Sequence, residues 1–218
     1  MHEHHLTVAR TARYHTLGPE SSPKQVWFLL HGYAQLAGRF LRYCAALDDG
    51  SRLLIAPEGL SRFYLEPGLH GADSRVGATW MTREDRLSEI NDYVGWLDAL
   101  YEHVFRTIDR DVTDVRVLAF SQATATACRW LVNGKARPDR LYLWGGFLPP
   151  DLPWPAGAET MRRLRLTVAL GRDDAYATTE RRRELTTTAA EHGFPVRIVE
   201  YDGGHRIEGD ALRSLAAE

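Results

Sequence analysis

The sequence predicts an α/β protein built on a mostly parallel, doubly wound sheet. Short apolar runs, typical of strands buried on both faces, alternate along the chain with longer segments of helical periodicity. Such alternation produces βαβ units with right-handed crossovers, so the strands align in parallel. The chain has 218 residues, of which 44% are hydrophobic and 26% are charged. That is an ordinary globular composition, and we expect a single domain over residues 1–218.

Continuous apolar runs mark the expected strands. The runs cover residues 26–30, 53–57, 115–120, 141–144, 166–170 and 196–199. Residues 6–15 are more polar and suit a strand at the edge of the sheet. In open α/β sheets, ligands bind beyond the carboxyl ends of the strands, so the residues that follow each run are the candidates for function.

Helices are expected between these runs. The longest covers residues 83–106, where apolar residues recur at spacings of three and four and Thr82 can cap the start. Other helices are expected near residues 36–47, 122–133, 177–192 and 208–217, with Gly134 and Gly193 at positions suited to C-terminal caps. Four prolines predict a stiff loop over residues 145–157, and no insertion is long enough for a large lid domain.

Composition excludes several classes of function. The formal net charge is −2, so the chain lacks the basic excess of a nucleic-acid-binding protein. The two cysteines, Cys44 and Cys128, are too few for a disulfide scaffold or a cysteine-based zinc site. The N-terminus carries no signal-peptide pattern and no run is long enough to span a bilayer, so we expect a cytoplasmic protein without stable membrane insertion. The sequence leaves the oligomeric state open.

A serine stands between the run 115–120 and the expected helix 122–133. The junction reads Ala119-Phe120-Ser121-Gln122-Ala123. A strand–Ser–helix junction is typical of the nucleophile elbow, whose sharp turn requires small residues two positions before and after the serine. Those positions are usually glycine and are alanine here. The alternative is that Ser121 only caps the helix.

An acid and a histidine follow two later runs. Gly171-Arg172-Asp173-Asp174 comes after the run 166–170, and His205 comes shortly after the run 196–199. Each alone is typical of a solvated loop. The chain order Ser, acid, His, with each residue just past a strand, is that of α/β-hydrolase triads. Backbone N–H groups of His31-Gly32-Tyr33 and of Gln122 would then form an oxyanion hole.

The chain resembles the phospholipase/carboxylesterase family of small α/β-hydrolases, which includes acyl-protein thioesterases and lysophospholipases. The matching segments are Leu29-Leu30-His31-Gly32-Tyr33, Phe120-Ser121-Gln122, Gly145-Gly146-Phe147-Leu148-Pro149, Gly171-x-x-Asp174 and Gly204-His205. The resemblance implies an α/β-hydrolase fold and a triad of Ser121, Asp174 and His205, with Asp174 rather than Asp173 as the acid. It also implies that Tyr33 and Gln122 supply the oxyanion N–H groups.

Four residues are candidate walls of a substrate pocket. Trp80 and Met81 lie in a loop before the long helix, and Phe147 and Leu148 follow a strand. For Trp80 and Met81, core packing is an equal alternative. No metal site is expected, because the histidines at positions 2, 4 and 5 lie in a terminus without a framework to fix coordination geometry.

The function expected from these residues is that of a serine esterase acting on small-molecule carboxylic esters or thioesters without a cofactor. Lactone or peptide hydrolysis on the same triad is an alternative reaction. The alternative from another class is a weak or inactive hydrolase-fold protein that binds a ligand or partner, suggested by Ala119 and Ala123.

Overall fold

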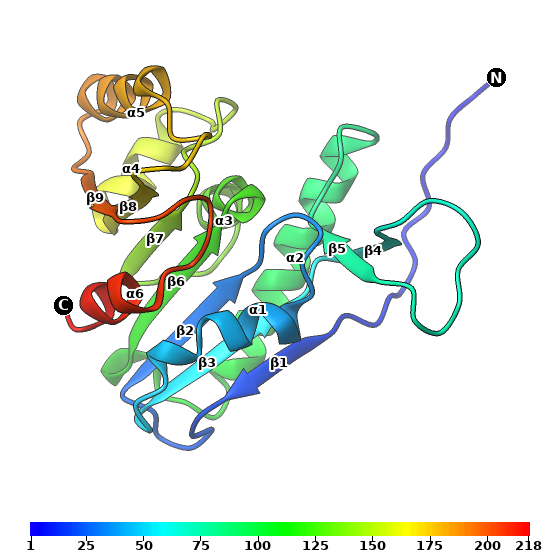
Figure 1. The fold of residues 1–218 in the computed structure, drawn as a ribbon, viewed down its shortest axis with the longest axis horizontal. Helices are drawn as coiled ribbons and strands as arrows, with labels where there is room; N and C mark the ends of the chain where they lie inside the picture. Colours follow the sequence, from blue (N-terminus) through cyan, green and yellow to red (C-terminus); the bar gives the residue numbers. More distant parts are fainter.

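The computed structural model describes residues 1–218 and contains a seven-stranded sheet in the order β1-β3-β2-β6-β7-β8-β9 (Figure 1). Only β1 is antiparallel to its neighbour, and all other pairs are parallel. The predicted doubly wound, mostly parallel sheet is confirmed. The strands are β1 (Tyr14–Leu17), β2 (Gln25–Leu30), β3 (Arg52–Pro57), β6 (Asp114–Phe120), β7 (Arg140–Trp144), β8 (Arg165–Gly171) and β9 (Arg197–Tyr201).

Helices cover both faces of this sheet (Figure 1). They are α1 (Ala37–Tyr43), α2 (Arg86–Val104), α3 (Gln122–Asn133), α4 (Ala156–Arg163), α5 (Thr179–His192) and α6 (Gly209–Ala216), with the 3-10 turns Ala45–Leu47 and Arg110–Val112. No helix combines the length and the apolar character that crossing a membrane requires.

Strand β2 lies in the interior of the sheet, and its contacts explain why residues 26–30 are continuously apolar. Val26, Phe28 and Leu30 belong to the larger core, which also contains buried residues of α2, α3, α4 and α5. The alternate residues Trp27 and Leu29 belong to the second core, beneath α1 and α6. Successive side chains of a strand point to opposite faces, so a strand with helices on both sides is apolar at every position.

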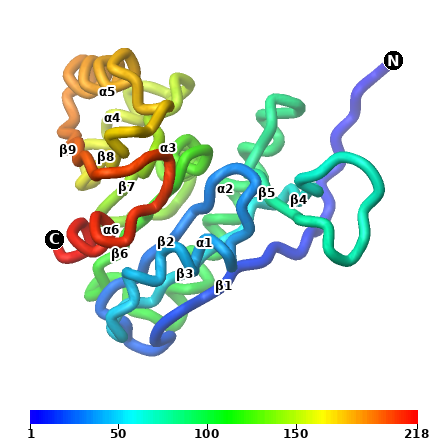
Figure 2. Tube along the Cα trace, viewed as in Figure 1, coloured from blue at the N-terminus to red at the C-terminus, as the bar shows by residue number.

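The prediction of an edge strand over residues 6–15 is wrong in its bounds. The strand β1 begins only at Tyr14, which pairs with Pro57, the last residue of β3. Earlier residues therefore have no strand to pair with, and the N-terminal segment runs away from the sheet (Figure 2).

Two helix ends also differ between the structure and the expectation from the sequence. The long helix begins at Arg86 rather than residue 83, because Asp85 adopts a left-handed backbone (φ 44°) that cannot continue a helix. Thr82 does not cap it, and its hydroxyl instead accepts the N–H of Glu84. Gly193 ends α5 in the left-handed conformation (φ 65°) as expected, whereas the backbone of Gly134 is extended.

A two-stranded antiparallel hairpin, β4 (Ser61–Tyr64) with β5 (Val76–Thr79), was not predicted. Both strands are short, and neither carries a continuous apolar run. The loop between them projects from the body of the protein, on the same side as the N-terminal segment (Figure 2). An isolated bridge between Gln35 and Ala78 ties the hairpin to the segment that follows β2. The hairpin therefore positions residues 79–81 beside the carboxyl ends of the central strands.

Candidate active site

Ser121 occupies a sharp turn between β6, which ends at Phe120, and α3, which begins at Gln122. Its backbone has φ 56° and ψ −116°, a conformation that costs a residue with a side chain roughly 1–3 kcal/mol. The Ser121 N–H donates to the carbonyl of Trp144 at the end of β7 (2.9 Å), which holds the turn against the next strand. The turn presents the serine side chain beyond the carboxyl end of the sheet.

His205 lies within hydrogen-bond distance of Ser121 and Asp174. Its Nε2 is 2.8 Å from Ser121 Oγ, and its Nδ1 is 2.8 Å from Asp174 Oδ2. The imidazole ring contacts the rings of Phe120 and Tyr176, whose centroids lie 4.9 and 4.8 Å away. The structure therefore brings the three side chains together in one chain of hydrogen bonds and fixes the orientation of the imidazole.

The two neighbouring acids Asp173 and Asp174 have opposite surroundings. The side chain of Asp174 is fully buried, and its other oxygen, Oδ1, accepts the backbone N–H of Tyr176 (2.9 Å). Asp173 is exposed, and only its backbone N–H is bonded, to the carbonyl of Gly203. A Cβ atom on Gly171 would overlap that same carbonyl oxygen, so this glycine lets the loops after β8 and β9 approach closely enough to join Asp174 and His205.

Two backbone N–H groups just past the carboxyl ends of the paired strands β2 and β6 make no hydrogen bond within the protein. They belong to Gln122, the first residue of α3, and to Tyr33, in the turn after β2. N–H groups at the first turn of a helix have no intrahelical acceptor and are suited to an anionic ligand. These are the groups expected from the sequence to bind an oxyanion.

A neutral histidine supports the turn that carries Tyr33. His31 is fully buried, and its Nε2 accepts the N–H of Gly59 (3.0 Å). The ring proton therefore resides on Nδ1, which donates to the carbonyl of Gly32 (2.8 Å). Burial lowers the pKa of His31 below its ordinary value, because the imidazolium would lose its hydration. This histidine is thus a structural donor and acceptor.

The side chain of Gln122 has a role that the sequence analysis missed. Its amide N–H groups donate to the carbonyl of Met81 and to the hydroxyl of Thr79 (both 2.9 Å), and its oxygen accepts the N–H of Trp80 (3.3 Å). Gln122 therefore ties the segment after β5 to the serine turn. No sequence signal indicates this, because residues 79–81 and 122 meet only through the hairpin.

A cavity of about 390 Å³ opens beside Ser121 and His205. Three of the expected pocket residues, Met81, Phe147 and Leu148, line it. Trp80 does not: it is buried in the core, stacks on His31 and donates its indole N–H to the His31 carbonyl (2.7 Å). Lining residues that the sequence analysis did not name include Thr124, Thr126, Arg129, Tyr176 and Arg181.

The sequence does indicate some of these lining residues. Gln122, Ala125, Thr126 and Arg129 all lie on α3 and all line the cavity. Their spacings of three and four place them on one helix face, so the lining could have been found once α3 was known to start at the serine. The guanidinium of Arg129 is held by the carboxylate of Asp151 (2.7 Å).

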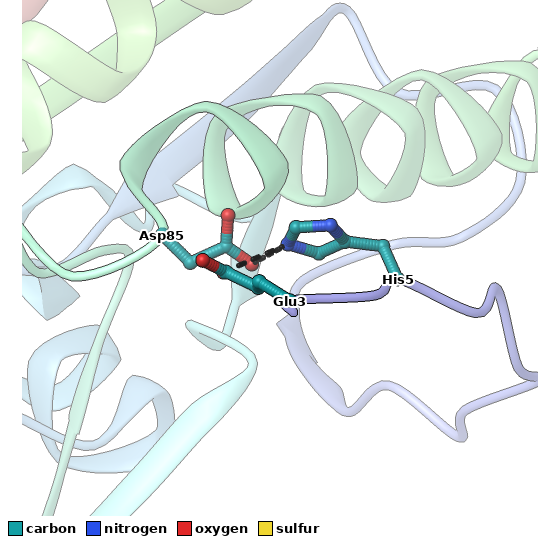
Figure 3. Close-up of side chains that lie close together, drawn as sticks. All are labelled: Glu3, His5 and Asp85. Atoms are coloured by element: carbon teal, nitrogen blue, oxygen red, sulfur yellow. Dashed lines mark hydrogen bonds and ion pairs between the residues drawn. The ribbon is translucent and has the colours of Figure 1, made fainter. Parts of the chain in front are cut away.

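The side chains able to bind a metal ion come together elsewhere. Glu3, His5 and Asp85 are exposed, and His5 Nε2 lies 3.1 Å from a carboxylate oxygen of Asp85 and 3.5 Å from one of Glu3 (Figure 3). A hydrogen bond between His5 and Asp85 accounts for their approach. Neither cysteine is suited to act as a nucleophile, because both are buried and burial raises the pKa of Cys128 to about 12.

Comparison with known proteins shows the fold. No protein-family model matches the chain, and no curated protein sequence matches it. Among solved structures, a carboxylesterase from Mesorhizobium loti has a TM-score of 0.70 and 17% sequence identity, over 94% of this chain and 94% of that one. Acyl-protein thioesterase 2 from Zea mays has a TM-score of 0.69 and 17% identity, over 95% and 97%. The Bacillus cereus carboxylesterase has a TM-score of 0.66 and 12% identity, over 94% and 92%. The predicted α/β-hydrolase fold without a large lid is therefore confirmed.

Proposed function

We propose that this protein is a serine hydrolase that cleaves carboxylic esters or thioesters. The observation that carries the proposal is the chain of hydrogen bonds Asp174–His205–Ser121, with both links at 2.8 Å. The strained turn at Ser121 gives independent support, because it exposes the serine beside a cavity. The similar solved structures that are named carboxylesterases and an acyl-protein thioesterase agree with this chemistry.

The geometry supports a reaction in two stages. In the first, Ser121 Oγ attacks the carbonyl carbon while His205 Nε2 accepts the hydroxyl proton. The oxyanion forms opposite the N–H groups of Gln122 and Tyr33, where one such donor contributes about 3–4 kcal/mol. His205 then donates the proton to the departing alcohol or thiol, and an acyl group remains on Ser121.

In the second stage, water replaces the alcohol as the attacking group. His205 accepts a proton from this water, hydroxide adds to the acyl carbon, and the proton returns to Ser121 Oγ as the carboxylic acid leaves. The sum is one ester and one water converted to one acid and one alcohol. Asp174 stabilises the imidazolium that forms twice in the cycle and keeps the Nδ1–H tautomer in place.

Labelling with a fluorophosphonate probe tests the proposal. We expect covalent labelling of the wild-type protein, loss of labelling and of esterase activity in Ser121→Ala, and normal labelling in Ser214→Ala, an exposed serine on α6. A panel of p-nitrophenyl esters then measures acyl preference, and we expect short to medium chains to react fastest because the cavity holds about 390 Å³. Absence of labelling in the folded wild-type protein would favour the ligand-binding alternative.

A further inference from the structure

The cavity beside Ser121 has an unusual charge composition. Two of its lining residues carry guanidinium groups, Arg129 and Arg181, and none of the lining residues is an aspartate or glutamate. A cleft lined by one sign of charge raises the local concentration of ligands of the opposite sign. The lining therefore favours an anionic ligand over a neutral or cationic one.

The two guanidinium groups differ in what they are free to bind. Arg129 is buried and already paired with Asp151, which also pairs with Arg86. Arg181 is exposed, forms no ion pair, and donates no hydrogen bond from its side chain. Glu184, three residues further along α5, makes no ion pair with it either. Arg181 is thus the cation of this cavity whose donors are uncommitted.

The orientation of Arg181 is nevertheless defined. Its guanidinium carbon lies 5.2 Å from the ring centroid of Phe147, another residue of the cavity wall. Stacking on an aromatic face uses the plane of the guanidinium and leaves its N–H donors free at the edge. A planar fork of donors held in this way matches the two oxygens of a carboxylate.

A second polar group in the same wall also lacks a partner within the protein. Thr126 is 1% exposed and lines the cavity, and its hydroxyl makes no hydrogen bond. The hydroxyl oxygen itself is buried, so Thr126 adds an unpaired polar group to the wall without opening onto the cavity. Together with Arg181, it makes this a polar site with a single strong anion-binding group.

We propose that the substrates of this protein are short esters that carry a carboxylate, and that Arg181 binds this carboxylate. The inference rests on the proposed function and deepens it. Arg181 is a specificity residue: it contacts the remote end of the substrate and takes no part in bond making. The carboxylate belongs either to the acyl part or to the alcohol part of the ester, and the two cases are separable by experiment.

The test compares each charged ester with a neutral ester of the same shape. One series contains monomethyl esters of straight-chain diacids of four to eight carbons, each paired with the ester in which an amide replaces the free carboxylate. The other contains O-acetyl ω-hydroxy acids paired with their amides. The measured quantity is the ratio of kcat/KM for the acid to that for the amide. We expect a ratio of about 10 or more in one series, falling at high salt because exposed charges are screened.

Variants of α5 assign the effect to Arg181. We expect Arg181→Gln to reduce the ratio by about tenfold and Arg181→Lys to keep part of the preference. Arg183→Gln is the matched control, because Arg183 is exposed on the same helix, forms no ion pair and does not line the cavity. A ratio near 1 in both series, or a ratio that Arg181→Gln leaves unchanged, would overturn the inference and leave the esterase proposal standing.

Binding of a diacid supplies a readout that needs no turnover. Calorimetric titration of hexanedioate into the wild-type protein is expected to show binding that weakens about tenfold in Arg181→Gln and stays the same in Arg183→Gln. If no ester is hydrolysed and Ser121 is not labelled, the proposed function fails. The titration then decides the inference about Arg181 separately, and absence of binding to the wild-type protein overturns it.

Discussion

Replacing Asp174 by asparagine tests the role of the buried carboxylate with little change of shape. The amide oxygen of the new side chain can still accept the N–H of Tyr176, so the loop keeps its fold. The amide N–H₂ then faces Nδ1 of His205 in place of the carboxylate oxygen that lies 2.8 Å away. Nδ1 must accept from this amide, which moves the ring proton to Nε2, the atom that faces Ser121 Oγ at 2.8 Å. In that tautomer His205 cannot remove the serine proton.

We expect the size of the loss to be about 10⁴-fold in kcat, as the equivalent change costs in serine proteases. A factor of 10⁴ corresponds to about 5.5 kcal/mol, more than the roughly 1.5–3 kcal/mol of one hydrogen bond to a charged group. The remainder comes from the uncompensated imidazolium in the transition state. Asp173→Asn is the control, because its exposed carboxylate accepts no hydrogen bond, and we expect a change of kcat within about twofold.

Steady-state hydrolysis of a p-nitrophenyl ester measures both variants, and circular dichroism checks that each is folded. A larger loss of kcat in Asp173→Asn than in Asp174→Asn would refute the assignment. Equal, small losses in both would show that the hydrogen bond between Asp174 and His205 does not support catalysis.

Three further predictions concern stability. In urea titrations, the free energy of unfolding of Ser121→Gly should be about 1 kcal/mol higher than that of Ser121→Ala, because glycine adopts φ 56° without strain. Equal free energies of unfolding would contradict a strained turn. Thr126→Val should raise the free energy of unfolding by about 1 kcal/mol, since it removes a buried hydroxyl without a partner, and a fall of that size would indicate a hydrogen bond that the structure lacks. The pKa of His31 is lower in the folded protein, where the side chain is buried, than in the unfolded chain. As the pH falls below about 6.5, the unfolded chain therefore binds a proton at His31 that the folded protein does not bind. Stability should therefore decrease from pH 6.5 towards pH 5, by up to about 1.4 kcal/mol per pH unit, and His31→Asn should flatten this slope in urea titrations at each pH.

The features that the sequence predicted well depend on local patterns. The buried strands follow from continuous apolar runs, and Ser121, Asp174 and His205 stood out because each comes just after such a run. Their meeting in the structure follows from the parallel sheet, which gathers the carboxyl ends of its strands at one edge. Their catalytic roles stay predictions until the activity is measured.

The features that the sequence did not predict depend on contacts between distant segments. Trp80 lies in the core because the β4–β5 hairpin turns it towards His31, and the hairpin has no apolar run to reveal it. The place of Arg181 in the cavity depends on how α5 lies beside Phe147, which no local pattern of the sequence indicates. The long helix starts at Arg86 because of the left-handed backbone of Asp85, which the expected cap at Thr82 does not reveal.

The alanines at positions 119 and 123 were the reason to consider an inactive protein, because the turn at Ser121 brings backbone segments close together. The structure shows which residues provide the space. A Cβ atom on Gly146 would overlap the Thr124 hydroxyl and lie 3.0 Å from the Ser121 carbonyl oxygen, and one on Gly145 would lie 3.1 Å from the His205 ring. The glycines that permit close approach therefore stand at the end of the neighbouring strand β7. Both alanine side chains are fully buried, and Ser121 keeps its strained backbone beside them. The alanines thus give no steric reason to expect a misplaced nucleophile, and the labelling of Ser121 decides between the enzyme and the ligand-binding alternative.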